Sequence, residues 1–342
     1  MSGRNALSRL FRGSWFAAGC GLWILGLCGG AFEARALVDA NSPGNTNAPS
    51  DGVPWANLGR VNGSGGIYLG NGWVLTPVHV GPGNVDFDGT IVAWDGTSKQ
   101  LTNSDGSGAD MMLFHLGALP VLPNLALASS TPPALSTNDM IGFGFIAGSV
   151  QTSLGAYSGF DWSAIQFKSW GNNRVNTGPV TMQNDGIGNN ASFMMDFTSP
   201  LTPGQTSDEA QAAPGDSGGG VFYKNPSGWE LSGMIYAIDT LPSQPGNTAV
   251  YGDITYAADI ATYRSQILSI AAQTPAVSIS SSGTNVLLCW MDTGVSYSLQ
   301  TTPTLQPTSW AIITPSTFPT NGDICAQLPA TNSARFFRLS HP

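Results

Sequence analysis

The chain has 342 residues, of which 43 are glycine, 23 are proline and only 10% are charged. This composition is typical of a folded, turn-rich protein and excludes an intrinsically disordered one, which needs more charge and fewer aromatic residues. The formal net charge of -9 excludes the basic face on which nucleic-acid binding depends, so we expect no nucleic-acid partner.

Residues 1–36 have the pattern of a secretory signal peptide. Three arginines precede an uncharged apolar run over residues 14–32, and Ala34-Arg35-Ala36 offers a small-x-small cleavage site. Leu37 is then the first mature residue, and cleavage after Ala40 is a fallback. The competing interpretation is an uncleaved membrane anchor, because the run approaches the length of a short transmembrane helix. Cleavage predicts a secreted, periplasmic or cell-surface protein without a membrane span.

Residues 37–52 are polar and rich in chain breakers, which predicts a flexible lead-in or a short pro-segment. The apolar runs at 66–69 and 73–76 flank Gly70-Asn71-Gly72 and predict a β-hairpin. Further short strands are predicted at 90–93, 111–116, 140–145, 164–167, 192–197, 219–223 and 231–236. Their close spacing favours an all-β sandwich or barrel over alternating strands and helices.

One amphipathic helix is predicted at residues 259–270, with Asp259 as its N-cap. A separate small β module is predicted over residues 276–342, with strands at 277–279, 286–290, 297–300 and 336–339. At this size a hydrophobic core is marginal without a further crosslink. Cys289 and Cys325 remain after signal removal, and export permits a disulfide between them; two free buried thiols are the alternative.

The stretch Gly215-Asp216-Ser217-Gly218-Gly219-Gly220 predicts a serine presented on a tight turn, because glycine allows a positive φ and a close approach of other chain segments. The backbone N–H groups of Gly215 and Ser217 would then point into one small volume, which is the geometry that stabilises an oxyanion. A polar surface loop is the alternative interpretation, since glycine, serine and aspartate dominate turns.

A serine nucleophile usually needs a histidine base, and the chain has three histidines. His79 follows a buried-looking strand and is the best placed. His115 alternates with apolar residues and is expected on the solvent face of a strand. His341 lies in the C-terminal module.

Three blocks of sequence resemble the chymotrypsin/trypsin-like serine proteases. Residues 71–80 resemble the block that carries the catalytic histidine, Ala109-Asp110-Met111-Met112-Leu113 resembles the aspartate block, and Gly215-Asp216-Ser217-Gly218-Gly219 matches the nucleophile block. Their order along the chain is also that of the family. The resemblance covers residues 55–273. It implies an all-β fold of two six-stranded Greek-key β-barrels with a C-terminal helix.

The resemblance also implies a function: a secreted serine endopeptidase that hydrolyses protein or peptide substrates through an acyl-enzyme, without a cofactor or metal. Ser217 is then the nucleophile, His79 the base and Asp110 the residue that orients the base, within a protease domain at residues 53–273. Two alternatives stay open. One is a catalytically inactive protease-fold protein that serves binding or adhesion, and the other is an esterase with the same triad.

The sequence motifs say less about substrate preference than about the catalytic residues. By alignment to the nucleophile block, Gln211 falls near the base of the specificity pocket, and Tyr236 falls beside the substrate. Glutamine has no charge, although the nearby Asp208 or Glu209 could favour a basic substrate side chain. Arg60-Val61 lies too close to His79 for a trypsin-style activation site, so Asp216 is expected to bond locally and not to a new N-terminus.

The C-terminal module loosely resembles the fibronectin type III domains of secreted proteins. Trp290, Tyr297 and Trp310 could form a face for a sugar or for a cell-surface or extracellular protein partner. Packing in a core is the alternative, which we favour because aromatic residues at strand spacing usually form core.

Overall fold

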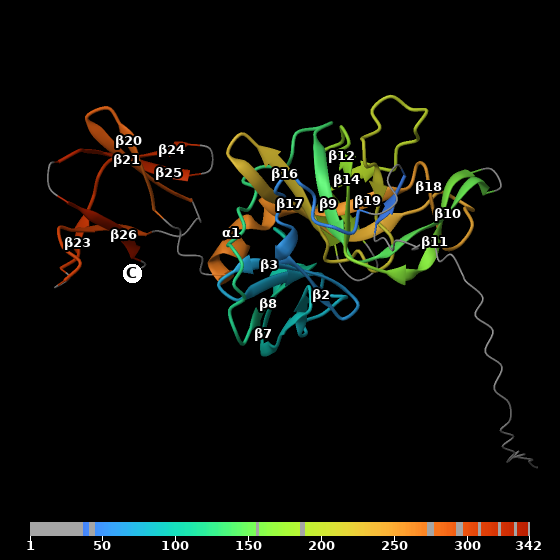
Figure 1. The fold of residues 1–342 in the computed structure, drawn as a ribbon, viewed down its shortest axis with the longest axis horizontal. Helices are drawn as coiled ribbons and strands as arrows, with labels where there is room; N and C mark the ends of the chain where they lie inside the picture. Colours follow the sequence, from blue (N-terminus) through green and yellow to red (C-terminus); the bar gives the residue numbers. More distant parts are fainter. Residues whose placement is uncertain are drawn as a thin grey trace, which may run out of the picture. The chain divides into compact units, whose positions relative to one another are not determined.

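The computed structural model describes residues 37–40, 45–154, 157–184, 189–271, 277–291, 297–306, 309–320, 323–331 and 334–340. The predicted signal peptide, the predicted junction at residues 273–276 and His341 lie outside these ranges. The regular secondary structure of the described residues is nearly all β-strand, with a curled half-barrel sheet (Figure 1). No helix within the described ranges is long and apolar enough to cross a membrane.

The N-terminal sheet has seven strands in the order β6-β5-β2-β3-β4-β8-β7. Their bounds are β2 (Leu58–Val61), β3 (Ser64–Gly70), β4 (Trp73–Thr76), β5 (Val85–Phe87), β6 (Thr90–Val92), β7 (Trp94–Thr102) and β8 (Gly108–Leu116). The predicted hairpin is β3–β4, and Asn71 and Gly72 both have positive φ, as its tight turn requires. Pairing of β4 with β8 brings the end of the hairpin beside Asp110.

A second seven-stranded sheet has the order β12-β9-β16-β17-β19-β14-β13, and β10, β11 and β18 form a separate three-stranded sheet. The bounds are β9 (Thr137–Gly142), β10 (Phe145–Leu154), β11 (Tyr157–Gln166), β12 (Ser169–Arg174), β13 (Thr181–Asn184), β14 (Asn189–Asp196), β16 (Gly220–Asn225), β17 (Gly228–Asp239), β18 (Thr248–Val250) and β19 (Ile254–Asp259). The turn that carries Ser217 enters this sheet through β16.

The lead-in differs from the flexible segment expected from its composition. Leu37 and Val38 are fully buried, and β1 (Val38–Asp39) pairs with β15 (Ala210–Gln211). Further along, Asn47 O accepts a hydrogen bond from Trp170 Nε1. The segment is polar on average, but it contains the apolar residues Leu37 and Val38. Their burial among residues of the later strands holds the segment in place.

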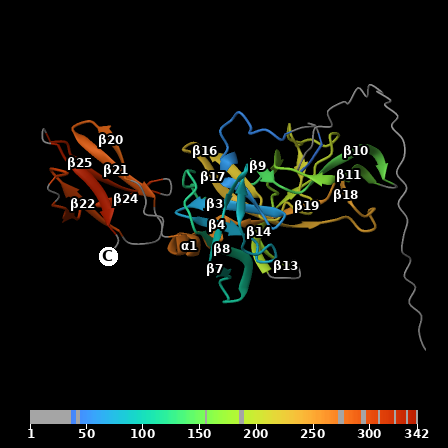
Figure 2. The ribbon, with the colours of Figure 1, turned by 60° about the horizontal axis from the view of Figure 1, so that its bottom comes forward.

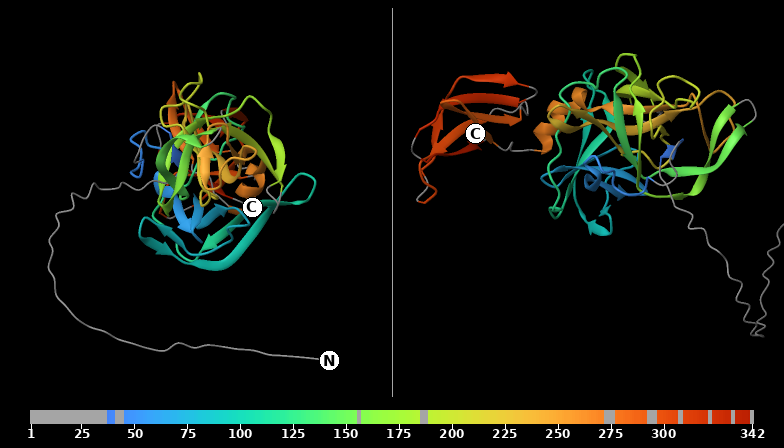
Figure 3. Two further views of the ribbon diagram at one scale, coloured as in Figure 1. Left: turned by 90° about the vertical axis from the view of Figure 1, so that its right-hand side faces the viewer. Right: turned by 45° about the horizontal axis from the view of Figure 1, so that its top comes forward.

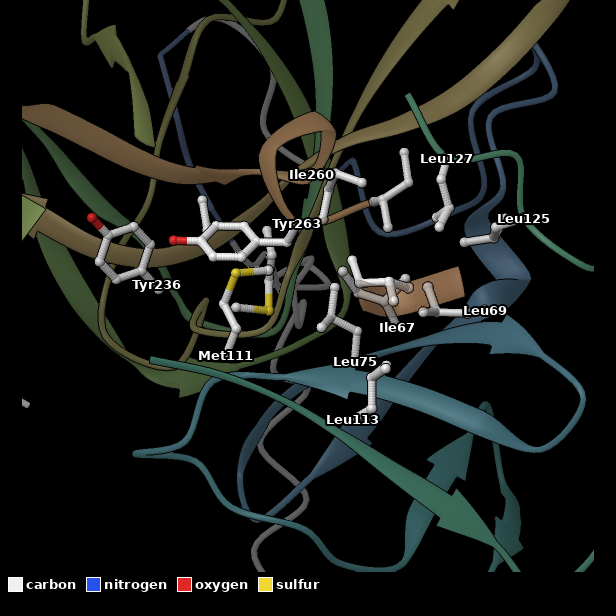
Figure 4. Packing of buried hydrophobic residues seen from close by; sticks show 14 of the residues in the cluster. Ile67, Leu69, Leu75, Met111, Leu113, Leu125, Leu127, Tyr236, Ile260 and Tyr263 are labelled. Carbon is white, nitrogen blue, oxygen red and sulfur yellow. The ribbon is translucent and has the colours of Figure 1, made fainter. Parts of the chain in front are cut away.

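The largest hydrophobic cluster joins the two seven-stranded sheets to α1 (Ile260–Ala271) (Figure 4). Ile67, Leu75 and Leu113 enter it from the first sheet, and Ile260 and Tyr263 enter it from the helix. The helix lies beside β7 and β8 (Figure 2). It begins where it was predicted, because Asp259 Oδ2 accepts hydrogen bonds from the N and Oγ1 atoms of Thr262 as an N-cap does.

The C-terminal module consists of two small sheets (Figure 3). One contains β20 (Ser278–Ser282), β21 (Asn285–Met291), β24 (Thr317–Thr320) and β25 (Asp323–Pro329), and the other contains β22 (Ser298–Thr302), β23 (Ala311–Ile313) and β26 (Phe336–Ser340). Cys289 and Cys325 are paired across β21 and β25 as a disulfide. Trp290 is buried in the module's cluster and Tyr297 packs against it, whereas Trp310 lies under the Arg338 guanidinium.

Candidate active site

His79 and Asp110 are joined through both carboxylate oxygens. His79 Nδ1 lies 2.6 Å from Asp110 Oδ2, and the backbone N–H of His79 donates to Oδ1 over 3.1 Å. The Asp110 side chain is fully buried in β8, and the His79 side chain is 22% exposed. Because a carboxylate only accepts, the proton of the neutral ring is held on Nδ1, which leaves Nε2 as an acceptor.

Ser217 faces that acceptor. Its Oγ lies 2.9 Å from His79 Nε2, so the three predicted residues form one continuous chain of hydrogen bonds. The serine is carried on a turn in which Gly215 and Gly218 both have positive φ, at 98° and 80°. Gly65 of the first sheet donates its N–H to Ser217 O over 2.8 Å, and a Cβ on Gly218 would overlap Gly65 O. Glycine at these positions therefore lets the two sheets meet at the serine.

The predicted oxyanion donors are the N–H groups of Gly215 and Ser217, in the turn that carries this hydroxyl. Within the described part of the chain, neither donates to a protein acceptor, whereas the intervening Asp216 N–H bonds to Ala213 O over 3.0 Å. Two N–H groups of one turn that bond to no described acceptor are available to stabilise the negative charge that develops on a carbonyl oxygen when the Ser217 hydroxyl attacks it.

Asp216 is completely buried and bonds locally, as expected. Its Oδ1 accepts the N–H of Gly144 over 2.7 Å, and its Oδ2 accepts the N–H of Ala213 over 2.8 Å. Burial raises the pKa of this carboxyl to about 7. A Cβ on Gly142 or Gly144 would overlap the carboxyl oxygens, so this Gly-Phe-Gly segment provides the space that Asp216 occupies.

A small cavity of about 90 Å³ opens beside Ser217. It is lined by Ala212, Ala213, Pro214, Ser217, Ile235, Tyr236, Ala237 and Ile238. None of these residues carries a charge, and apart from the Ser217 and Tyr236 hydroxyls their side chains are apolar. The cavity is therefore suited to an uncharged apolar side chain of a substrate.

The two predicted pocket residues have different positions. Tyr236 lines the cavity, and its hydroxyl hydrogen-bonds with Ser192 Oγ over 2.8 Å. Gln211 is not in the described lining; it is buried, and its Oε1 accepts from Thr255 Oγ1 over 3.0 Å. Glu209 is also buried, and it accepts bonds from Thr198 and Thr206, so it does not face a substrate.

The structure adds two residues that sequence patterns did not mark as site residues. Arg60 Nη2 donates to Gln166 Oε1 over 2.7 Å, and the Gln166 amide packs against Gly215. No motif signals this pair, because the two residues are far apart in sequence and meet only through the fold. Within the described ranges, no group of three or more His, Cys, Asp or Glu side chains is placed to hold a metal ion.

No protein-family model matches the sequence, and no curated protein matches it. Among solved structures, the NS6 protease of murine norovirus 1 is 16% identical, with 63% of this chain and 94% of that chain covered and a TM-score of 0.38. An inactive serine-to-alanine variant of Rv3671c from M. tuberculosis is 13% identical, with coverages of 71% and 100% and a TM-score of 0.42. HRV-C 3C protein with rupintrivir is 13% identical, with coverages of 60% and 92% and a TM-score of 0.34. TM-scores this low do not establish a shared fold, so these similarities carry no part of the proposal that follows.

Proposed function

We propose that this protein is a serine endopeptidase with Ser217 as its nucleophile. The observation that carries the proposal is the hydrogen-bonded chain from Ser217 Oγ through the His79 ring to Asp110, with distances of 2.9 Å and 2.6 Å. The N–H groups of Gly215 and Ser217, in the same turn as the nucleophile, donate to no acceptor among the described residues. This combination of nucleophile, oriented base and oxyanion donors is the arrangement that acyl transfer requires.

The reaction follows from these positions. His79 Nε2 takes the hydroxyl proton as Ser217 Oγ bonds to the scissile carbonyl carbon, and the N–H groups of Gly215 and Ser217 bind the oxyanion. His79 then gives that proton to the leaving nitrogen as the carbon–nitrogen bond breaks, which leaves an acyl-enzyme. Water, deprotonated by His79, attacks the ester and releases Ser217. Asp110 stabilises the imidazolium in both halves of the reaction.

The substrate class follows from the cavity beside Ser217. A peptide whose residue before the scissile bond has a small or medium apolar side chain can place that side chain among Ala213, Ile235 and Ile238. A charged side chain would lose its hydration there without gaining a partner, which costs several kcal/mol. We further propose that the fold is chymotrypsin-like. The sheet of strands β2–β8 then forms one barrel, and the sheets that contain β9–β14 and β16–β19 form the other. We also propose that the protein is extracytoplasmic, because residues 1–36 have the pattern of a secretory signal peptide.

The test is covalent labelling of the full chain with a fluorophosphonate probe, combined with turnover of casein and of short acyl esters. We expect wild-type protein to take up one label and to cleave casein, and Ser217→Ala to do neither. Ser227→Ala, which removes the hydroxyl of an exposed loop serine, is the matched control and should behave as wild type.

Two results would separate the alternatives. Wild-type protein that takes no label identifies an inactive, binding protein. Protein that takes the label and hydrolyses esters but not casein identifies an esterase. A cleavage profile from a peptide library then tests the apolar preference, which fails if charged residues dominate before the scissile bond.

A further inference from the structure

Arg60 comes from the first sheet and approaches the nucleophile turn from that side. It lies in β2 directly opposite Gly65 of β3, and Gly65 in turn donates its N–H to Ser217 O over 2.8 Å. Arg60 is therefore one strand away from the serine. Its side chain extends to Gln166 of β11 and is half-buried, so part of it remains in contact with solvent.

Gln166 approaches the same turn from the second sheet group. It is the last residue of β11 and pairs with Phe145, whose N–H donates to Pro214 O over 3.1 Å. A Cβ on Gly215 would overlap Gln166 Nε2, so the amide of Gln166 lies directly on the Gly215 backbone. Gly215 carries one of the two proposed oxyanion donors, so Gln166 contacts a residue of the site.

The chemistry of the pair fixes the orientation of the glutamine. A guanidinium only donates, so the atom of Gln166 that meets Arg60 Nη2 at 2.7 Å is the oxygen Oε1. The NH₂ group must then face the other way, toward Gly215. Among the described residues, no acceptor is bonded to Nε2. Arg60 thus holds in place an amide donor for which the described residues offer no hydrogen-bond acceptor.

The position of this donor relative to the cavity indicates which part of a substrate it meets. The cavity beside Ser217 is lined by residues 212–214 and 235–238, and neither Gln166 nor Arg60 belongs to the lining. The side chain of the residue before the scissile bond occupies that cavity. The part of the substrate after the scissile bond therefore extends from Ser217 in another direction. Gln166 packs on Gly215 but is not part of that lining, so it is available to the part of the substrate that does not enter the cavity.

We propose that Gln166, positioned by Arg60, binds the leaving-group side of the substrate: Nε2 donates a hydrogen bond to a backbone carbonyl within the first residues after the scissile bond. This inference rests on the proposed function. Gln166 contacts the substrate, whereas Arg60 is a positioning residue that acts through Gln166. The pair makes the site selective for peptides that extend past the cleaved bond over esters and amides that end there.

The experiment compares two substrates that share one acyl part. One is a peptide that continues for several residues after the scissile bond, and the other is a simple ester that ends there. We expect Gln166→Ala and Gln166→Met, which remove the donor without adding a charge, to lower kcat/KM for the peptide by about fivefold or more, the worth of one hydrogen bond, and to lower kcat/KM for the ester by a smaller factor. Arg60→Met should produce a smaller loss on the peptide alone. The fraction of acyl-enzyme captured by an added amino-acid amide in place of water should fall in parallel.

Gln166→Met is the decisive variant, because it keeps the length of the side chain, adds no charge and removes the donor. Gln327→Met, the same change at an exposed position of β25, is the control and should match wild type on both substrates. Equal losses on peptide and ester, or a fully active Gln166→Met, would overturn the inference while leaving the proposed function intact. Wild-type protein that turns over neither substrate overturns both. Thermal unfolding of each variant shows whether a loss reflects misfolding.

Discussion

Single residues decide whether the Ser217 hydroxyl can react. Asp110 matters because its two oxygens hold both the ring and the backbone of His79. The chain contains a second pair of the same type, in which His115 Nδ1 lies 2.7 Å from Asp95 Oδ2. That pair bonds back to Asn71 O over 3.1 Å and has no serine beside it in the described structure. An aspartate–histidine pair is therefore not sufficient for the chemistry, and the placement of Ser217 is what distinguishes the first pair.

We predict that Asp110→Asn lowers kcat by about 10³–10⁴-fold, because an amide can donate to Nδ1 and thereby place the ring proton on the wrong nitrogen. Steady-state kinetics on a peptide substrate measures the change. Asp95→Asn is the matched control and should retain wild-type kcat. Similar losses in the two variants would show that neither acts through the tautomer of His79.

Gly142 is needed because the carboxyl of Asp216 fills the space of its missing side chain. We predict that Gly142→Ala costs about 1–3 kcal/mol of stability through overpacking and slows fluorophosphonate labelling by displacing Asp216 from the nucleophile turn. At Gly246, a Cβ would meet nothing within 4 Å, so Gly246→Ala should change neither measurement. Urea unfolding and labelling rates test both. If Gly142→Ala is destabilised but is labelled at the wild-type rate, the position of Asp216 does not control the reactivity of Ser217.

At the scale of elements, α1 connects the sheets through one buried hydroxyl. Tyr263 OH accepts the Ala191 N–H of β14 over 2.8 Å and donates to Asn103 Oδ1, which follows β7, over 2.6 Å. The helix also bonds to the end of β7 through Gln266 and Thr102. These contacts fix the distance between the sheet that carries His79 and the sheet that carries Ser217.

We predict that Tyr263→Phe lowers the free energy of unfolding by about 1–3 kcal/mol, because it leaves a buried N–H and a buried amide oxygen without their partner. Activity at ambient temperature should be retained, since no triad atom is touched. Chemical denaturation followed by tryptophan fluorescence is the measurement. Unfolding at the wild-type denaturant concentration would contradict the role given to this hydroxyl.

The strands and the helix also show which elements local sequence patterns can predict. The hairpin β3–β4 and helix α1 were predicted, because a Gly-Asn-Gly turn and a periodic apolar stripe are local signals. Strand β7 was not predicted, because most of its side chains are exposed and no apolar alternation marks it. The described lead-in is ordered by Leu37 and Val38, whose partners lie in distant strands. Local patterns cannot report a strand whose stability comes from pairing alone.

At the scale of the whole molecule, several carboxyl groups are buried, and burial raises their pKa values. Burial, with repulsion from Asp51, raises the pKa of Asp139 to about 7. Burial alone raises that of Asp216 to the same value, and the pKa values of Glu209, Asp253 and Asp259 are also raised by burial. The folded state therefore binds protons that an unfolded chain, with aspartate pKa values near 4, has already released.

We predict that the free energy of unfolding falls as the pH rises from about 4 to about 7 and levels off above that range. Each proton held only by the folded state contributes about 1.4 kcal/mol per pH unit, and the sign is negative because the unfolded state binds fewer protons in this window. Urea titrations between pH 4 and 9 give the slope. Asp139→Asn should make it shallower. Stability that rises through this window would contradict the direction assigned to these groups.

The sequence by itself determined the all-β composition, the helix, and the identity and order of His79, Asp110 and Ser217, because each of these has a signal within a few neighbouring residues. Only the tertiary structure decided that the three side chains form a continuous hydrogen-bonded chain, that uncharged residues line the cavity and that Gln211 is not among them. It alone brought Arg60 and Gln166 to Gly215. The physical reason is distance along the chain: these features are made by residues of separate sheets, and strand pairing and glycine-permitted close approach, which no local pattern encodes, bring them together.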